Sequence, residues 1–474
     1  MLILAPTCLV ALFWPARRII LKRHGIPSSS SAATVPITTT STQASPAPAI
    51  ETPLEAYLPQ KPFLTIYRGG MMVITCLAIL AVDFQIFPRR FAKVETWGTS
   101  LMDLGVGSFV FSMGLVSARG PLKDRFLRRT PTLLVALRRS LRQTTSVLLL
   151  GMLRLLLVKA VDYHEHTSEY GVHWNFFMTL GFLPPFVSLF NFLERYASSS
   201  ALALAVGFVY QGFLSYTPLA EFILTAPRTS IIAMNKEGIF SFFGYLAIFL
   251  SGQTTGLYTL PSTPRSIRIP FVQRLLGLSS SQSSTSMASL SPASQLATSR
   301  KAMLTYLLFA GVAHTTLFVI CTHVRGLNMT VSRRLANLPY VLWVSSYNLL
   351  FILLYLLVDM TFFPGPNSHH NASSWSSSTS SSQSPTSGFS LSPSSSALST
   401  PVRYEDSVPR GLQAVNENGL AVFLLANLLT GAVNLSINTL EIRNIEALLV
   451  LIAYAAVLAV FAGFAKSRGW RLRI

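Results

Sequence analysis

A carboxylate and an amine ten residues apart are the first residues in this sequence whose types and spacing suggest chemistry. Asp83 ends a long apolar run, and Lys93 follows it beyond Pro88. Because Pro88 cannot donate a helical hydrogen bond, we expect the helix to stop or kink there. In a partly dry site, each group would shift the other's proton affinity. The pair could then act as general base and oxyanion stabiliser in acyl transfer. A salt bridge that fixes the loop is the open alternative.

A second polar group follows the fourth apolar run and is rich in histidine. It contains Asp162, His164, Glu165, His166 and His173. The His-x-His spacing is not that of a known zinc motif and no HExxH pattern is present, so we predict no metal. General acid or base catalysis by one histidine is one interpretation. A polar plug that hydrogen-bonds the loops is the other.

A third candidate is Asp103, which lies within the apolar run at 99–117. A carboxylate inside a membrane span faces the interior of the bundle by default. Asp103 would therefore either line the site or bond a neighbouring helix. The glycines that follow it, Gly105 and Gly107, do not follow a strand and do not form a nucleotide-binding fingerprint; small residues favour close helix packing instead.

The elements that must position these residues are membrane helices. Hydrophobic residues make up 50% of the chain and charged residues only 12%, whereas soluble domains carry about 25% charged residues. We predict an all-α polytopic membrane protein, a bundle of about eleven transmembrane helices. The predicted spans are 1–15, 66–87, 99–117, 143–161, 174–192, 199–217, 238–257, 302–322, 339–361, 418–440 and 445–465.

The position of the basic residues argues for a membrane rather than for nucleic acid, although the net charge is +19. Eight Lys and Arg residues fall in the single loop at 118–142, between two apolar runs. Such loops lie in the cytosol. Alternation then predicts a cytosolic C-terminal tail and places the polar loops around Asp83, His164 and Asn235 in the lumen. We expect no nucleic-acid partner.

Three segments rich in Ser, Thr, Pro and Ala divide the chain. They cannot bury enough apolar surface to offset chain entropy, so we expect disordered loops without chemistry. The predicted organisation is an N-terminal hydrophobic segment with a basic flank, a disordered loop, a multispan domain with two Ser-rich insertions, and a basic tail. The N-terminal segment covers 1–23 and the disordered loop 24–61. The multispan domain covers 62–465, with the insertions at 275–299 and 365–403, and the tail covers 466–474.

These residues alone leave two classes of function open. The sequence has no GxSxG, no phosphate-binding glycine loop and no Cys/His nucleophile arrangement. A membrane enzyme and a transporter or flippase for a lipid or solute would both need polar groups inside a bundle. No convincing internal repeat of the transporter kind is present.

Several ordered strings nevertheless resemble one family, the glucosaminyl-phosphatidylinositol inositol acyltransferases, whose fungal members are called GPI-anchored wall transfer proteins. They are spread over roughly 62–465. The strings are YRGGMM at 67–72, DFQIFPRRFAK at 83–93, ETWGTSLMDLGVG at 95–107, the stretch 162–175, APRTS at 226–230, NKEG at 235–238, NLPY at 337–340 and the stretch 418–438.

The resemblance implies an endoplasmic reticulum enzyme that transfers a fatty acyl chain, typically palmitoyl, from acyl-CoA to the inositol ring of glucosaminyl-phosphatidylinositol. It implies no cofactor beyond acyl-CoA as co-substrate, and membrane lipid as surroundings. Asp83 and Lys93 would be the catalytic pair, and Arg89 and Arg90 would hold phosphate. The other candidate residues would form the second wall or bind substrate: Asp103, Asp162, His164, Glu165, His166, His173, Arg228, Asn235 and Lys236.

The chain departs from this family in one respect. Members have about thirteen spans and more chain before the YRGGMM string, whereas about eleven spans are predicted here. We therefore expect a shortened N-terminus.

Overall fold

The computed structural model describes residues 53–160, 167–193, 197–262, 292–363 and 404–470, and within these ranges every regular element is helical. The helices of the first half are α2 (Pro53–Tyr57), α3 (Pro62–Ala81), η1 (Arg89–Phe91), α4 (Asp103–Ser117), α5 (Arg119–Phe126), α6 (Leu133–Ala160), α7 (Thr167–Tyr170), α8 (Phe176–Leu193) and α9 (Ser199–Tyr216). Those of the second half are α10 (Leu219–Thr225), α11 (Ile231–Met234), α12 (Lys236–Thr259), α14 (Pro292–His323), α15 (Leu338–Phe362), α16 (Tyr404–Ser407), α17 (Arg410–Glu417), α18 (Gly419–Ser436) and α19 (Asn444–Ser467).

The all-α, multispan class predicted from the sequence is confirmed. Six of the described helices are long and apolar enough to cross a membrane: α3, α8, α14, α15, α18 and α19. The count becomes seven if α9 and α10, which meet at a 77° bend, form one broken span. The predicted number of eleven is not confirmed by this measure, because α4, α6 and α12 fall outside it. The predicted span at 1–15 lies outside the described residues.

Several helix ends differ from the predicted ones. Helix α3 begins with Pro62 at its first turn and ends at Ala81, before Pro88, so the whole segment from Val82 to Met102 is irregular apart from η1. Helix α14 begins at Pro292, inside the predicted loop at 275–299, because proline is well tolerated at the first position of a helix. Likewise α2 lies within the predicted loop at 24–61, and Tyr57 stacks on Phe126.

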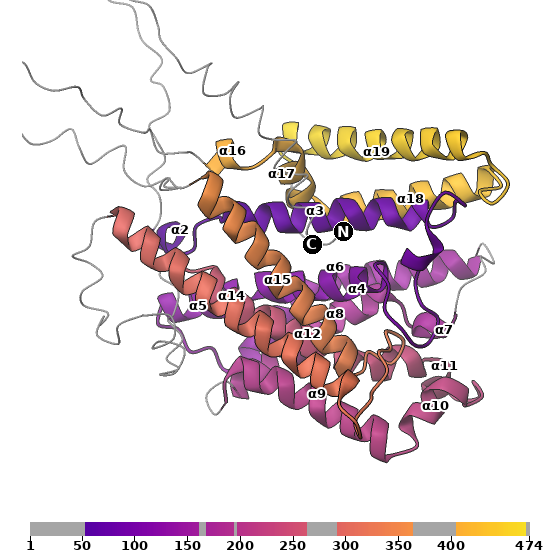
Figure 1. Ribbon diagram of the computed structural model, residues 1–474, viewed down its shortest axis with the longest axis horizontal. Coiled ribbons are helices and arrows are strands. Elements are labelled where there is room, and N and C mark those ends of the chain that lie inside the picture. Colours follow the sequence, from indigo (N-terminus) through magenta and orange to yellow (C-terminus); the bar gives the residue numbers. More distant parts are fainter. Residues whose placement is uncertain (1–52, 161–166, 194–196, 263–291, 364–403, 471–474) are drawn as a thin grey trace, which may run out of the picture.

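The helices run roughly side by side, and short elements gather at their two ends (Figure 1). Helices α7, α10 and α11 lie at one end, and α2, α5 and α16 lie at the other. The irregular segment after α3 is at the end that holds α7. The described parts of the polar loops singled out in the sequence are therefore neighbours in space.

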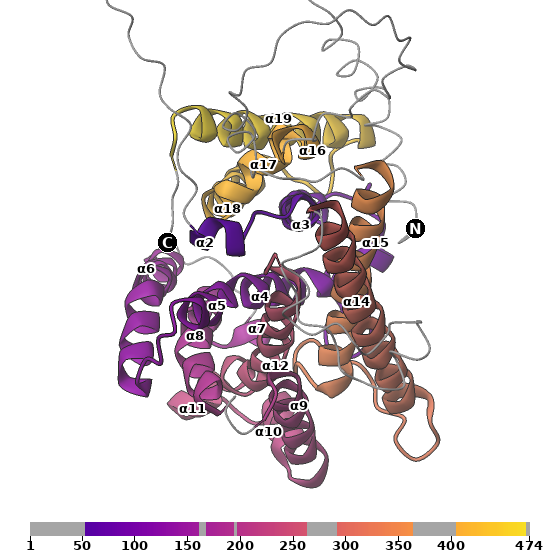
Figure 2. The same cartoon turned by 90° about the vertical axis from the view of Figure 1, so that its left-hand side faces the viewer.

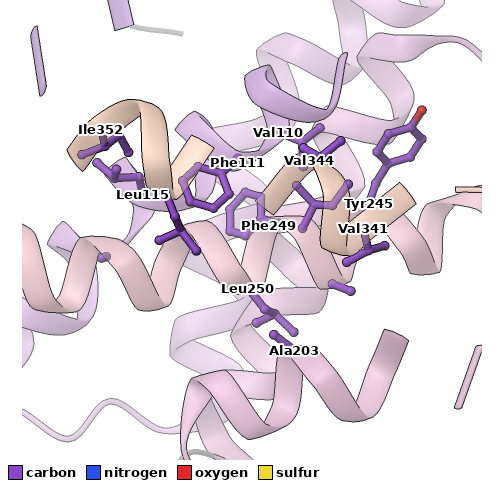
Figure 3. Close-up of a cluster of buried hydrophobic side chains, with 14 of the residues drawn as sticks. Val110, Phe111, Leu115, Ala203, Tyr245, Phe249, Leu250, Val341, Val344 and Ile352 are labelled. Carbon is purple, nitrogen blue, oxygen red and sulfur yellow. The ribbon is translucent and has the colours of Figure 1, made fainter. Parts of the chain in front are cut away.

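The centre of the larger group of helices is α12, which is buried along most of its length. Side chains from α4, α9, α12 and α15 meet around it, among them Phe111, Leu250 and Val344 (Figure 3). Helices α4 and α12 approach so closely that a Cβ atom on Gly252 would overlap the Phe111 carbonyl oxygen, and one on Gly114 would overlap that of Phe249. Small residues permit this contact, as is usual between membrane helices.

A second, smaller group consists of α3, α17, α18 and α19, and it has a hydrophobic cluster of its own around Cys76, Leu80 and Tyr454. In Figure 2 this group lies above the helices that surround α12. Helix α3 belongs to both groups, since Phe63 and Tyr67 pack in the larger cluster. The site described next lies where the two groups face each other.

Candidate functional site

A cavity of about 840 Å³ lies between α3 and α18 on one side and α4, α6, α8 and α15 on the other. On α3 its wall extends from Ile79 to Tyr67, and twelve residues of helix correspond to about 18 Å. Most of the wall is apolar. Three charged side chains line it, Lys93, Arg154 and Glu169, so the cavity combines a long apolar part with a polar end.

Lys93 is held at this cavity by a network of ion pairs. Its ammonium lies 3.0 Å from Oε1 of Glu169, in α7. Arg333 donates to the same carboxylate at 3.3 Å and to Oδ1 of Asp103 at 2.9 Å. One carboxylate is therefore shared by two cations, and only one of the cations, Lys93, faces the cavity.

Asp103 is the buried carboxylate of this network. Its side chain is 1% exposed and accepts hydrogen bonds from the backbone N–H groups of Val94 and Ser100 and from the Ser100 hydroxyl. These bonds tie down the segment that carries Lys93. The structure places Asp103 in the first turn of α4, and it bonds neighbouring segments rather than lining the cavity.

Arg333 is nearly buried, in the loop before α15. Burial is the largest single effect and acts against its charge, but the Glu169 carboxylate and the neighbouring tyrosines together outweigh it and raise the pKa of the guanidinium. Arg333 is therefore a permanent cation beside the Glu169 carboxylate that also binds Lys93.

Asp83 has a different partner from Lys93. Nδ2 of Asn434, in α18, donates to Oδ2 of Asp83 at 2.9 Å. No ion pair joins Asp83 to Lys93 among the described residues, and Asp83 is not part of the cavity wall. Yet Asn427 and Gly431, which do line the cavity, share one face of α18 with Asn434, because their spacing is four and three residues. Asp83 thus lies one turn beyond the cavity wall.

The two arginines of the same segment point to nearby groups. Arg89 donates to the Val82 carbonyl oxygen at 2.8 Å. The Arg90 guanidinium lies 4.9 Å from the centre of the Phe91 ring. Both arginines are exposed, so their charges remain accessible at this end of the molecule.

Arg228 belongs to a second network, next to the first. It pairs with Glu237 at 2.7 Å, and Arg334 pairs with the same oxygen at 3.0 Å. Glu237 is fully buried. Lys236 donates to the Ala226 carbonyl oxygen, and its ammonium lies 5.8 Å from the Phe222 ring centre.

Asn235 shapes the loop that leads into α8. Its Oδ1 accepts the backbone N–H groups of His173 and Trp174 at 2.8 and 3.0 Å. Its amide lies 3.4 Å from Nδ1 of His173. Gly171 packs against Asn235 with a φ of +114°, where a side chain would be strained. Asn235 and His173 therefore belong to the frame around the cavity.

Four candidates from the histidine-rich segment, Asp162, His164, Glu165 and His166, lie outside the described residues. In the part of the chain that the structure describes, no group of three or more His, Cys, Asp or Glu side chains could hold a metal ion.

The sequence reasoning missed four residues of this region: Arg154, Glu169, Arg333 and Asn434. The signal for Arg154 was its charge inside an apolar run, and the signal for Asn434 was a polar side chain within a span. Nothing in the sequence indicated that Arg333, 230 positions from Asp103, would bond it.

The fold and the site define a multi-pass all-α membrane protein with charged side chains at one end of a long apolar cavity. A profile of the GWT1 family matches residues 1–465. The chain is 46% identical over 411 residues to the GPI-anchored wall transfer protein 1 of Gibberella zeae, covering 85% of this chain and 72% of that protein. The Saccharomyces cerevisiae protein of the same name is 40% identical over 413 residues, covering 86% and 74%. That of Candida albicans is 38% identical over 416 residues, covering 87% and 76%.

This chain belongs to the GWT1 family, as the match over nearly its whole length shows. The resemblance drawn from the strings between 67 and 438 is thereby confirmed.

Proposed function

We propose that this protein acts in GPI-anchor biosynthesis by transferring a fatty acyl chain from acyl-CoA to the inositol ring of glucosaminyl-phosphatidylinositol. The observation that carries the proposal is the cavity, which joins an apolar channel to the ammonium of Lys93. Membership of the GWT1 family, whose relatives are named as GPI-anchored wall transfer proteins, supports the pathway.

The cavity suits an acyl chain in both length and lining. Its wall along α3 is about 18 Å long, and a membrane lipid chain fills about half of a hydrocarbon core that is roughly 30 Å thick. Each CH₂ group moved from water into such a wall contributes about 0.8 kcal/mol. A chain of palmitoyl length bound there would present its carboxyl carbon at the charged end.

In the proposed reaction Asp83 takes the proton of an inositol hydroxyl, whose oxygen then attacks the thioester carbonyl carbon. Lys93 stabilises the negative charge that develops on the carbonyl oxygen. The carbon–sulfur bond breaks, and the CoA thiolate leaves and accepts a proton, while the new ester remains on the inositol. Asp83 is one helical turn of α18 from the cavity wall, and Lys93 lines it, so a substrate between them would meet both groups.

Arg89 and Arg90 would hold phosphate beside this site, since guanidinium groups pair with phosphate through two hydrogen bonds. We place the site on the lumenal face of the endoplasmic reticulum membrane and the C-terminal tail in the cytosol. The basic loop at 118–142 supports this orientation, and α5, which is part of that loop, lies at the end opposite α7 (Figure 1).

The test is acyl transfer in microsomes that contain this protein as their sole acyltransferase of this type. We expect radiolabelled palmitoyl-CoA to label glucosaminyl-phosphatidylinositol, with the label in an inositol ester that is sensitive to alkali. A chain that folds, inserts and leaves this lipid unlabelled, while translocating it across the membrane, would favour a flippase instead.

A further inference from the structure

Arg154 is a charged residue in an apolar part of α6. It lies six residues before the helix ends at Ala160, which places it about 9 Å inside that end. Leu150 and Leu153 share its face of the helix, and all three line the cavity. A charge at such a depth is costly and marks a functional site by default.

Nothing in the described part of the chain neutralises Arg154. The carboxylates nearest the cavity are already shared, Glu169 by Lys93 and Arg333, and Asp103 by Arg333. No ion pair among the described residues includes Arg154. The polar end of the cavity therefore carries a cation with no ion-pair partner among the described residues, and the ammonium of Lys93 lies on the same wall.

The cavity is open on the side where Arg154 lies. Its wall there consists of α6 and α18, and these helices pack mainly on other neighbours, α6 on α8 and α18 on α3. Leu153 of α6 and Leu428 of α18 both line the cavity, yet they are 51% and 72% exposed. In a bilayer this side faces lipid, so an amphiphile can enter sideways with its chains in the apolar part.

We propose that Arg154 binds the phosphate of the phospholipid substrate as that lipid enters between α6 and α18. Guanidinium groups form paired, charge-assisted hydrogen bonds with phosphate oxygens, and these bonds strengthen away from water. The inference rests on the proposed function for its substrate, a phosphatidylinositol lipid. CoA also carries phosphates, but the opening toward the bilayer favours the lipid as their source.

The experiment measures binding to the purified full chain with three probes: fluorescent phosphatidylinositol, diacylglycerol with the same acyl chains, and palmitoyl-CoA. The variants are Arg154→Gln, which removes the charge, and Arg154→Lys, which keeps the charge but loses the paired geometry. The matched control is Arg142→Gln, in an exposed position of the same helix that does not line the cavity.

We expect Arg154→Gln to weaken phosphatidylinositol binding about tenfold or more and to leave diacylglycerol binding unchanged. Arg154→Lys should fall between Arg154→Gln and the wild type, and Arg142→Gln should match the wild type. If Arg154 only extends its charge toward the headgroup region, Arg154→Gln and Arg142→Gln should bind phosphatidylinositol equally well. That result would overturn the proposal.

A tenfold loss confined to palmitoyl-CoA would also overturn it, because the phosphate would then come from CoA. If Arg154→Gln is unstable, Arg154→Lys still tests the proposal. Lysine keeps the charge, so a side chain that only extends toward the headgroup region would leave phosphatidylinositol binding unchanged. Loss of the paired hydrogen bonds would weaken that binding. Binding needs no acyl transfer. A chain that binds phosphatidylinositol through Arg154 but transfers no acyl group would therefore refute the proposed function and not this inference.

Discussion

Two ion-pair networks lie side by side at the same end of this protein, and they are built alike. In each, one carboxylate is shared by two cations: Glu169 by Lys93 and Arg333, and Glu237 by Arg228 and Arg334. They differ in access. The side chain of Glu169 is 26% exposed and lines the cavity, whereas that of Glu237 is 0% exposed.

The contrast separates two uses of the same chemistry. A closed network holds segments together, and the loss of one member leaves a buried charge without compensation. An open network gains little stability, because solvent screens it, but it can present a cation to a ligand. Arg333 and Arg334 are adjacent in the chain, and each belongs to one network.

The largest effect should come from the closed network. We expect Glu237→Gln to destabilise the fold by about 3–5 kcal/mol, because Arg228 and Arg334 lose their shared partner in a buried site. The measurement is the thermal midpoint of the detergent-solubilised protein, with Glu446→Gln at an exposed position of α19 as control. Acyl transfer per folded molecule should stay near normal; a stable variant with low turnover would reverse the assignment of the two networks.

The next effect tests the catalytic pair. Lys93→Met and Asp83→Asn should each lower turnover per folded molecule about a hundredfold or more, equivalent to about 2.7 kcal/mol of barrier. The double variant should be scarcely slower than either single one, because residues that act as a unit are not additive. Near-normal turnover in both single variants, with normal protein abundance, would refute the pair and direct the search to His164, Glu165 and His166.

A smaller effect is expected at Glu169, which positions Lys93. Glu169→Gln should lower turnover about tenfold, because the ammonium loses its charged partner and its fixed place. Its thermal midpoint should change little, since the partly exposed pair with Lys93 contributes only about 0.2–1 kcal/mol and Arg333 keeps Asp103 as its partner. Glu169→Asp should recover part of the rate. A large fall in the midpoint would show that this network, too, is structural.

The smallest effect concerns a segment that belongs to neither network. Deletion of 376–398 should leave acyl transfer and abundance within about twofold of wild type, because this Ser-rich run carries no titratable side chain that could take part in the reaction. A protease site placed in 365–403 should also be cut from the cytosolic side of sealed microsomes. Protection of that site would reverse the proposed orientation.

The amino-acid sequence by itself determined the class of this protein. Runs of apolar residues must form helices in a bilayer, since every backbone polar group has to be satisfied within the segment. The helical class and the family resemblance could therefore be predicted from the sequence alone. The helix ends were less predictable. Helix α3 ends at Ala81 and α4 begins at Asp103, because bonds that fix the 82–102 segment come from Asp103 and from Val331, Ser332 and Glu169 elsewhere in the chain.

Only the tertiary structure decided which polar side chains share a site. Sequence spacing placed Asp83 and Lys93 together, but folding gives them separate partners, Asn434 and Glu169, which are 351 and 76 positions away. The physical reason is that a membrane helix fixes its own hydrogen bonds locally, whereas its charges are neutralised by whichever helix end packs beside them. The periodicity of the sequence does not indicate which charges will pair. The packing of α3 against α18 and of α12 against α4 determines those pairs.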